Sequence, residues 1–336
     1  MTIIKVENLT KEFRQFKREP GLVGGLKGLL HREYIVKQAV SNISMDIEEG
    51  EIIGYLGPNG AGKSTTIKML VGITVPSSGK VEVCGYEPHK SRQILSKKIG
   101  IVFGQRSQLW WDIPVSDTLN LLRYMYKIPE KNYKENIEMF YELLGIHEFK
   151  DIPVRQLSLG QRMRADICCS LLHNPEIILL DEPTIGLDVV VKEKIRSFIK
   201  EVNVHKKTTV LITTHDMSDI EKLCSRVVII DKGAKMFDGN LDYLKKNYGS
   251  MQTLTAELSS PLGVNLLYIQ EDGVISKDLI NNTLKITYDS NIINSSKIIS
   301  KIMKKVDVVD FKIIEMNTED IIRDLYQNIS TGLRSV

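Results

Sequence analysis

Cysteine is scarce in this sequence, and its four cysteines form no recognisable pattern. Cys84, Cys168, Cys169 and Cys224 occur among 336 residues, and none belongs to a C-x-x-C pair. Adjacent cysteines have neither metal-ligand spacing nor an easy disulfide geometry, so we expect reduced, buried thiols in a cytosolic protein. The sequence therefore predicts neither a disulfide framework nor a cysteine-based metal centre.

Long apolar runs and a strong net charge are also missing. No run approaches the roughly 20 residues that a membrane-spanning helix needs. Residues 1–13 alternate like a strand and lack the apolar core of a signal peptide. The net charge of +3 is too small by itself to favour nucleic acid, and no such partner is expected. We therefore expect a soluble chain whose membrane role, if any, depends on a partner.

What is present is the pattern of an α/β protein of about two domains. Strand-like and helical segments alternate, which predicts a parallel sheet. Residues 111–173 contain helices alone and are interpreted as a helical subdomain, with an apolar helix face at Leu119, Leu122, Met125 and Tyr126. The expected strands are Thr2–Val6, Ile43–Ile47, Glu51–Leu56, Lys80–Cys84, Ile99–Phe103, Ile177–Leu180, Val210–Thr214 and Val227–Ile230.

After about Asn240 the pattern becomes that of a small α+β domain. We therefore predict two domains, residues 1–240 and 241–336, each with its own core. A regulatory or dimer-stabilising role for the second domain and a plain stability role both remain open. Its expected strands are Thr253–Leu258, Leu284–Tyr288 and Val309–Glu315, and its expected helices are Leu241–Asn247, Ser295–Lys305 and Asp320–Asn328.

The motif G-P-N-G-A-G-K-S follows the strand-like run Glu51–Leu56 and precedes a helix. In such a P-loop, glycines let successive N–H groups point at one anion, and the helix dipole adds to the attraction. Lys63 can reach the β- and γ-phosphates of a nucleotide, and Ser64 can ligate Mg²⁺. A Gly-rich turn with a chance lysine suits this context poorly. The residues expected to bind the nucleotide here are Gly57, Pro58, Asn59, Gly60, Ala61, Gly62, Lys63, Ser64, Thr65 and Thr66.

An acidic pair ends the apolar run at Ile177–Leu180. Asp181 can hold the Mg²⁺ shell, and Glu182 can polarise an attacking water as a general base. A capped turn at the end of a buried strand is the plainer alternative. Upstream of this pair lies L-S-L-G-Q, from Leu157 to Gln161, at the start of a predicted helix.

Together these motifs resemble those of ATP-binding cassette (ABC) ATPases over about residues 1–240. L-S-L-G-Q looks like the family's signature, Gly186-Leu187-Asp188 like its D-loop, and Thr213–Asp216 like its switch-histidine loop. Gln105 looks like its glutamine loop. The resemblance implies an α/β P-loop NTPase with a RecA-like mixed sheet core and a helical subdomain, here followed by the small C-terminal α+β domain. It also implies that two cassettes pair head to tail, each ATP lying between one P-loop and the other chain's signature.

The resemblance assigns roles within that composite site. Ser158 and Gly160, together with Gln161, would bind the γ-phosphate held by a partner's P-loop. Asp188 would touch that P-loop. His215 would contact the γ-phosphate of its own P-loop and sense hydrolysis.

The catalytic set implied by the family is Glu182, His215, Lys63 and Gln105. Gln105, Ser64 and Asp181 would be the Mg²⁺ ligands. Phe13 stands at the position of the adenine-stacking aromatic. Tyr34 is the alternative, and Phe13 as a plain core residue is also possible.

Three departures from the family pattern stand out. Leu159 replaces the middle glycine of the signature, and Gly104 looks like an extra residue before Gln105. The connection Arg14–Lys37 is longer than usual and rich in Gly, Leu and basic residues. It could lie near lipid head groups or a permease, or it could be a solvated loop. None of these departures removes Lys63 or Glu182.

The function that these features predict is the ATPase subunit of an ABC transporter, working at the cytoplasmic face of the membrane through a separate permease. Trp110 and Trp111, in the stretch W-W-D-I-P, could anchor that permease or simply pack. The overall resemblance is closest to ATPases of ABC-2 exporters, and a homodimer is expected. A soluble ABC ATPase of DNA repair or translation is the alternative, and a small-molecule kinase has no use for L-S-L-G-Q. The sequence does not name the transported substrate.

Overall fold

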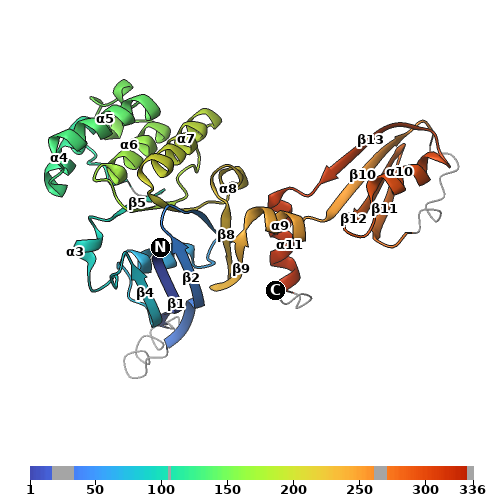
Figure 1. Ribbon diagram of the computed structural model, residues 1–336, viewed down its shortest axis with the longest axis horizontal. Helices are drawn as coiled ribbons and strands as arrows, with labels where there is room; N and C mark the ends of the chain where they lie inside the picture. Colours follow the sequence, from blue (N-terminus) through green and yellow to red (C-terminus); the bar gives the residue numbers. More distant parts are fainter. Residues whose placement is uncertain (17–33, 105–106, 261–270, 331–336) are drawn as a thin grey trace, which may run out of the picture. The chain divides into compact units, whose positions relative to one another are not determined.

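The computed structural model describes residues 1–16, 34–104, 107–260 and 271–330 (Figure 1). The chain divides into two compact units, Met1–Gly239 and Asn240–Val336, and each is described by itself. Among the described residues, no helix combines the length and the apolar character needed to cross a membrane.

The central sheet of the first unit has six strands in the order β5-β6-β7-β3-β8-β9. The side chains of β3, β5, β6, β7 and β8 are largely buried because these runs are apolar on both faces, whereas those of β9, at the edge, are mostly half-buried or exposed. Parallel pairing from β5 through β8 brings the carboxyl ends of these strands to one edge of the sheet. The strands are β3 (Ile52–Leu56), β5 (Ile99–Phe103), β6 (Ile177–Asp181), β7 (Thr209–Thr213), β8 (Arg226–Asp231) and β9 (Ala234–Asn240).

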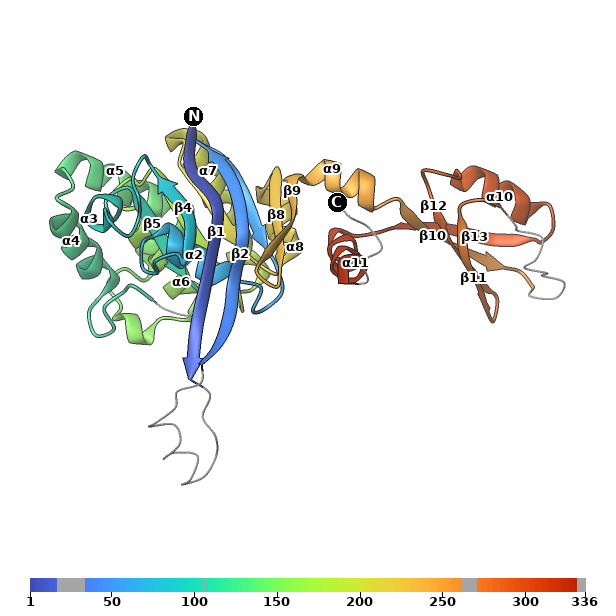
Figure 2. The same ribbon diagram turned by 90° about the horizontal axis from the view of Figure 1, so that it is seen from below.

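A second sheet, in the order β2-β1-β4, consists of β1 (Thr2–Phe16), β2 (Tyr34–Glu48) and β4 (Ser78–Val83). Figure 2 shows β1 and β2 as a long hairpin. The hairpin is longer than predicted: Phe13 pairs with Lys37 and Phe16 with Tyr34, so both ends of the expected insertion are strands. Residues 17–33, the middle of that insertion, lie outside the described residues. Apolar side chains of both sheets share one core.

Helices α4 to α7 lie together in the first unit (Figure 1). Leu119 and Leu122 are buried as predicted, but Met125 is 65% exposed because it points away from their face of α4. The helices of this unit are α2 (Lys63–Leu70), α3 (Arg92–Leu95), α4 (Val115–Tyr126), α5 (Glu130–Leu144), α6 (Leu159–Leu171), α7 (Val189–Lys206) and α8 (Met217–Leu223), with 3₁₀ turns at Ile146–Glu148 and Val154–Gln156.

The second unit contains an antiparallel sheet in the order β11-β12-β10-β13. Ile298 and Ile302 of one helix join Leu254 and Ile286 of the sheet in a separate core. The unit's elements are α9 (Leu241–Tyr248), β10 (Met251–Leu258), β11 (Val274–Ile280), β12 (Thr283–Asp289), α10 (Ser295–Met303), β13 (Val308–Glu315) and α11 (Thr318–Ser330). Strands β9 and β11 were not predicted from the sequence.

Candidate nucleotide-binding site

The P-loop is the turn between β3 and α2, and close contacts require its glycines. A Cβ on Gly57 would lie 2.6 Å from the Ile230 carbonyl oxygen. A Cβ on Gly62 would lie 2.5 Å from the Ala39 oxygen, and Gly62 also has a φ of +110°. The loop therefore sits tightly against β8 and β2, in a conformation that only glycine adopts without strain.

Lys63, the first residue of α2, curls back over this loop. Its Nζ donates to the carbonyl oxygens of Gly57, at 2.6 Å, and Pro58, at 3.2 Å, and the side chain is almost buried. Burial lowers the pKa of the lysine, although the carboxylates of Glu182 and Asp181 act in the opposite direction. The loop thus encloses a poorly hydrated cation, which suits the binding of a phosphate chain.

Asp181, at the carboxyl end of β6, accepts hydrogen bonds from two hydroxyl groups on neighbouring elements. Ser64 Oγ donates to its Oδ2 at 3.0 Å, and Thr213 Oγ1 donates to its Oδ1 at 2.5 Å. Among the described residues, no group of three His, Cys, Asp or Glu side chains is placed to hold a metal. An oxygen set of this kind fits Mg²⁺, which usually keeps waters and phosphate oxygens as further ligands.

Glu182 directly follows β6 and has a φ of +55°, in the left-handed region that a glutamate rarely adopts. Its backbone N–H donates to the Thr213 carbonyl oxygen at 2.9 Å, which holds the turn. The Glu182 carboxylate lies 3.6 Å from His215 Nδ1 on the loop after β7. Such a turn aims the carboxylate away from the strand, toward the same edge as the P-loop, and backbone strain of this kind often marks a functional site.

The signature segment forms the N-terminus of α6. Ser158 Oγ accepts from Gln161 N, and Gln161 Oε1 accepts from Ser158 N, so the two residues make a capping box. Leu159, the first helical residue, is half-exposed, and a Cβ on Gly186 would lie 3.2 Å from its side chain. The leucine that replaces the family's glycine thus fits because it points outward over the D-loop. Gly160 packs against α7.

The other sequence-predicted residues fall into several environments. Asp188 caps α7 by accepting from Val191 N at 2.9 Å. Phe13 is 41% exposed, with Lys11 Nζ 5.2 Å from its ring, so the alternative that Phe13 is a core residue is wrong. Tyr34 is exposed as well. Gln105 lies outside the described residues.

Thr66 was expected among the nucleotide-binding residues, but its side chain is fully buried. Its hydroxyl donates to Gly62 O at 3.2 Å and accepts from Tyr55 at 3.1 Å, and its N–H donates to Gly62 O. Thr66 therefore fixes α2 to β3, and its polar groups are already engaged inside the protein. Thr65, at the next position toward the N-terminus, is partly exposed.

A buried polar cluster that the sequence did not reveal lies behind Glu182 and His215. Asp219, on α8, is fully buried and accepts from Arg196 Nε at 2.6 Å and from Thr214 Oγ1 at 3.0 Å. It also accepts from Thr184. The cluster joins the loop after β6, the loop after β7 and helix α7. The T-H-D-x-x-D spacing marks a helix start, but no sequence signal indicates that Asp219 is buried.

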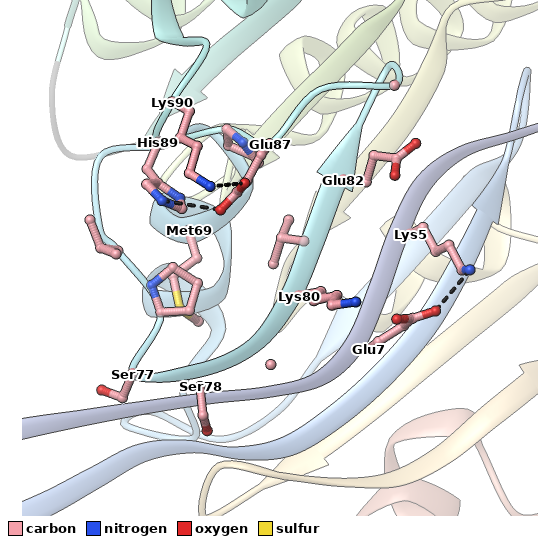
Figure 3. A pocket seen from close by; sticks show the side chains of 16 residues that line it. Lys5, Glu7, Met69, Ser77, Ser78, Lys80, Glu82, Glu87, His89 and Lys90 are labelled. Carbon is pink, nitrogen blue, oxygen red and sulfur yellow. Dashed lines mark ion pairs between the residues drawn. The ribbon is translucent and has the colours of Figure 1, made fainter.

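Figure 3 shows a pocket of about 770 Å³ in the first unit, bounded largely by β4 and its flanking turns. Several of its charged side chains are paired with one another: Lys5 lies 2.8 Å from Glu7, and Glu87 pairs with both His89 and Lys90. None of the residues Gly57–Ser64 lines it. The pocket is therefore separate from the P-loop site.

Comparisons with known proteins agree with this geometry. A family profile described as "ABC transporter" matches residues 40–185. The chain is 33% identical to the ABC transporter ATP-binding protein NatA of Bacillus subtilis, over 62% of this chain and 85% of NatA. It is also 33% identical to the Nod factor export ATP-binding protein I of Ralstonia nicotianae, over 62% of this chain and 65% of that protein.

Among solved structures, the chain is similar to an ATP-binding cassette determined as a dimer in a post-hydrolysis state with ADP and Pi. The TM-score is 0.59 and the identity 26%, over 71% of this chain and 98% of that chain.

Proposed function

This chain belongs to the ABC transporter family, as an ATP-hydrolysing ATP-binding subunit, and we propose how its residues carry out that activity. The observation that carries the proposal is the meeting of Lys63, Ser64, Asp181, Glu182 and His215 at one edge of the central sheet. These side chains come from α2, β6 and the loop after β7, which the parallel sheet brings together.

The phosphates of ATP bind in the P-loop, where Lys63 exchanges its two carbonyl partners for phosphate oxygens. Ser64 and Asp181, with Gln105, are the residues that would hold Mg²⁺, which would neutralise phosphate charge when bound. Thr213 fixes the orientation of the Asp181 carboxylate. Phe13 stacks on the adenine, since it is an exposed aromatic on the hairpin beside a cation.

Hydrolysis depends on Glu182 and His215. Glu182 accepts a proton from the attacking water, and its unusual backbone turn presents the carboxylate beyond the strand end. His215, which is exposed and 3.6 Å from that carboxylate, contacts the γ-phosphate and reports its loss. The loop that carries Glu182 is held against β7, because the Glu182 N–H donates to the carbonyl and hydroxyl oxygens of Thr213.

The complete site requires a second cassette. A similar cassette solved as a dimer supports the pairing of two cassettes, and we propose that they pair head to tail. In that arrangement Ser158, Gly160 and Gln161 of one chain face the γ-phosphate bound by the other, and Asp188 touches the opposite P-loop. Two identical chains would make two equivalent sites, which is the state we propose.

The subunit works at the cytoplasmic face of the membrane, where it drives a separate permease in the direction of export. The relative named for Nod factor export supports this assignment. Trp110 and Trp111, exposed by 41% and 51%, would be contact points for the permease. Arg162, just after the signature, stacks on Trp111 at 4.7 Å and joins this surface to α6.

Substitution of Glu182 by glutamine tests the mechanism. Glu182→Gln keeps the shape of the side chain but removes the base, so hydrolysis should fall by about 10²–10⁴-fold while ATP still binds. Steady-state phosphate release and equilibrium ATP binding measure the two effects. Glu193→Gln, an exposed glutamate of α7 outside the site, is the matched control. Near-normal turnover of Glu182→Gln would place the base elsewhere, and a strictly monomeric Glu182→Gln protein with ATP would refute the composite site.

A further inference from the structure

Strand β13 forms one edge of the C-terminal sheet, next to β10. Its side chains Val309, Ile313 and Ile314 are 66%, 43% and 47% exposed. Soluble proteins usually keep exposed edge strands short or poor in aliphatic residues, because unpaired backbone groups there recruit other strands. The ladder with β10 is regular from Asp310 to Glu315, whereas Val309 is an extra residue between the paired positions Val308 and Asp310. The regular part of this edge exposes Ile313 and Ile314, and such an edge can pair with another chain.

Two charged side chains of β13, Asp310 and Lys312, have no residue of opposite charge directly across from them on β10. Asp310 lies directly opposite Glu257 of β10, and two acids in such a cross-strand pair repel each other. Lys312, two residues further on, lies opposite Thr255. The ion pairs found among the described side chains include neither Asp310 nor Lys312. One chain thus presents an acid without a cation and a cation without an acid on the same face of its edge strand.

We propose that two copies of this chain pair through β13, antiparallel, around a two-fold axis at Phe311. In this register Asp310 faces the partner's Lys312 and Lys312 faces the partner's Asp310. The contact places a cation directly opposite each Asp310, where β10 of its own chain has Glu257, and it joins the two sheets into one.

No neighbouring register places Asp310 opposite the partner's Lys312. A two-fold axis normal to the sheet keeps each side chain on its own face, so facing residues must differ by an even number. Moving the axis to residue 310 puts Asp310 opposite the partner's Asp310. Moving it to residue 312 puts Lys312 opposite the partner's Lys312. Both shifts create like-charge pairs, which the central register avoids.

The opposite edge of the sheet, β11, does not have this property. Its charges, Lys277 and Asp278, are adjacent and therefore point to opposite faces. No two-fold antiparallel pairing can place them across from each other. A two-fold axis at Lys277 or at Asp278 places that residue opposite its own copy, which is a like-charge pair. Self-complementarity thus distinguishes β13 from the other edge of the same sheet.

The regular pairing involves about three residues on each strand, from Asp310 to Lys312, so it buries little area and is weak on its own. The inference goes beyond the proposed function, since it concerns a contact that needs no nucleotide.

Charge exchange tests the pairing in the full-length protein. Sedimentation velocity without nucleotide, over a concentration series, should show weak self-association of the unmodified chain. Lys312→Asp should weaken it about tenfold or more, because it creates two repulsive pairs per dimer, and the double variant D310K/K312D should restore it to within about threefold. Lys304→Asp, the same charge change at an exposed lysine at the end of α10, is the matched control and should leave it unchanged. Unaltered association of Lys312→Asp, or a double variant that stays as weak as Lys312→Asp, would overturn the proposal.

Cysteine cross-linking tests the register. Asp310 and the partner's Lys312 face each other at about 5 Å between Cα atoms, whereas the two copies of Asp310 lie about 8 Å apart, beyond the reach of a disulfide. Oxidation of a mixture of Asp310→Cys and Lys312→Cys chains, which keeps one charge pair per dimer, should therefore give a disulfide-linked dimer, and neither variant alone should. Linkage of either variant by itself would refute this register. Glu182→Gln with ATP reports the cassette dimer separately, so loss of that dimer alone would count against the head-to-tail site and not against β13.

Discussion

Replacement of Asp219 by alanine should lower the free energy of unfolding of the first unit by about 3 kcal/mol. Asp219 is fully buried and pairs with Arg196, whose side chain is only 6% exposed. The pKa of Arg196 reflects this pairing: burial alone would lower it, but the hydrogen bonds that Arg196 donates to Asp219 and Glu193, together with the charges of Asp219 and Asp216, outweigh burial and raise it. Removal of one partner from a buried ion pair costs about 3–5 kcal/mol, because the other charge stays behind.

The lower end of that range applies here because Arg196 retains other acids. Glu193 lies 3.1 Å and Asp216 3.6 Å from its guanidinium nitrogens. Urea denaturation followed by circular dichroism measures the free energy directly. In thermal unfolding, the same loss corresponds to about 6–12 °C for a unit of this size.

A double-mutant cycle separates the pair from its surroundings. Replacement of both residues, in R196M/D219L, removes both charges and should destabilise the protein less than Asp219→Ala alone. Glu193→Ala, at an exposed partner of Arg196, should cost at most about 1 kcal/mol. A free energy of unfolding for Asp219→Ala within about 1 kcal/mol of that of the unmodified protein would contradict this account of the buried pair. So would a loss for R196M/D219L equal to the sum of the losses for R196M and D219L.

Asp219 also accepts from Thr184 and Thr214, which lie next to the loops of Glu182 and His215. At temperatures where Asp219→Ala remains folded, ATP hydrolysis should therefore fall about tenfold or more while ATP affinity changes little. Equal losses of binding and turnover would indicate a general structural defect.

Three further predictions concern pH, the nucleobase and the metal. Burial raises the pKa of Asp166 to about 6, so its contribution to stability is complete below about pH 4 and falls by about 3 kcal/mol as pH rises to 6. Asp166→Asn should abolish this fall in the free energy of unfolding, as measured by urea titrations at several pH values. The two proteins should be compared in a His173→Phe background, because burial lowers the pKa of His173 to about 4, so that His173 makes stability rise over the same pH range. Phe13→Ala should weaken ATP binding about tenfold in fluorescence titrations and Tyr34→Ala should not, and the reverse result would make Tyr34 the stacking residue. Thr213→Val, which removes the hydroxyl that orients Asp181, should weaken Mg²⁺ affinity about tenfold and leave metal-free ATP binding unchanged, as calorimetry would show.

The central sheet could be predicted because its strands are short apolar runs at regular positions. Ile99–Phe103 matches β5 without change, and Ile177–Leu180 matches all but the last residue of β6. Burial on both faces makes such strands continuously apolar, which is a strong signal. The outer half of the β1–β2 hairpin is largely exposed and so lacks this signal, even though Tyr34, Ile35 and Val36 are residue types that favour strands. Strand β11 was missed for the same reason, since most of its side chains are exposed or half-buried.

The candidate site could be predicted where chemistry depends on adjacent residues, and not where it depends on distant ones. The P-loop and the pair Asp181–Glu182 are contiguous motifs, so their order and spacing identify them. Asp219 and Arg196 are 23 positions apart and on different helices, so only the fold shows that they pair. The left-handed backbone of Glu182 is likewise invisible in the sequence, because its cause is the sharp turn after β6.

The contacts behind the site also connect its two halves within one chain. Leu159, at the signature, lies against Gly186 of the D-loop, and Asp188 of that loop caps α7. Helix α7 carries Lys192 to Asp216, beside His215, at 2.5 Å. In the proposed dimer the signature faces the other chain's ATP, whereas His215 faces its own. A continuous set of packed side chains therefore links the two ATP sites, so a displacement at one γ-phosphate has a structural route to the switch loop of the other.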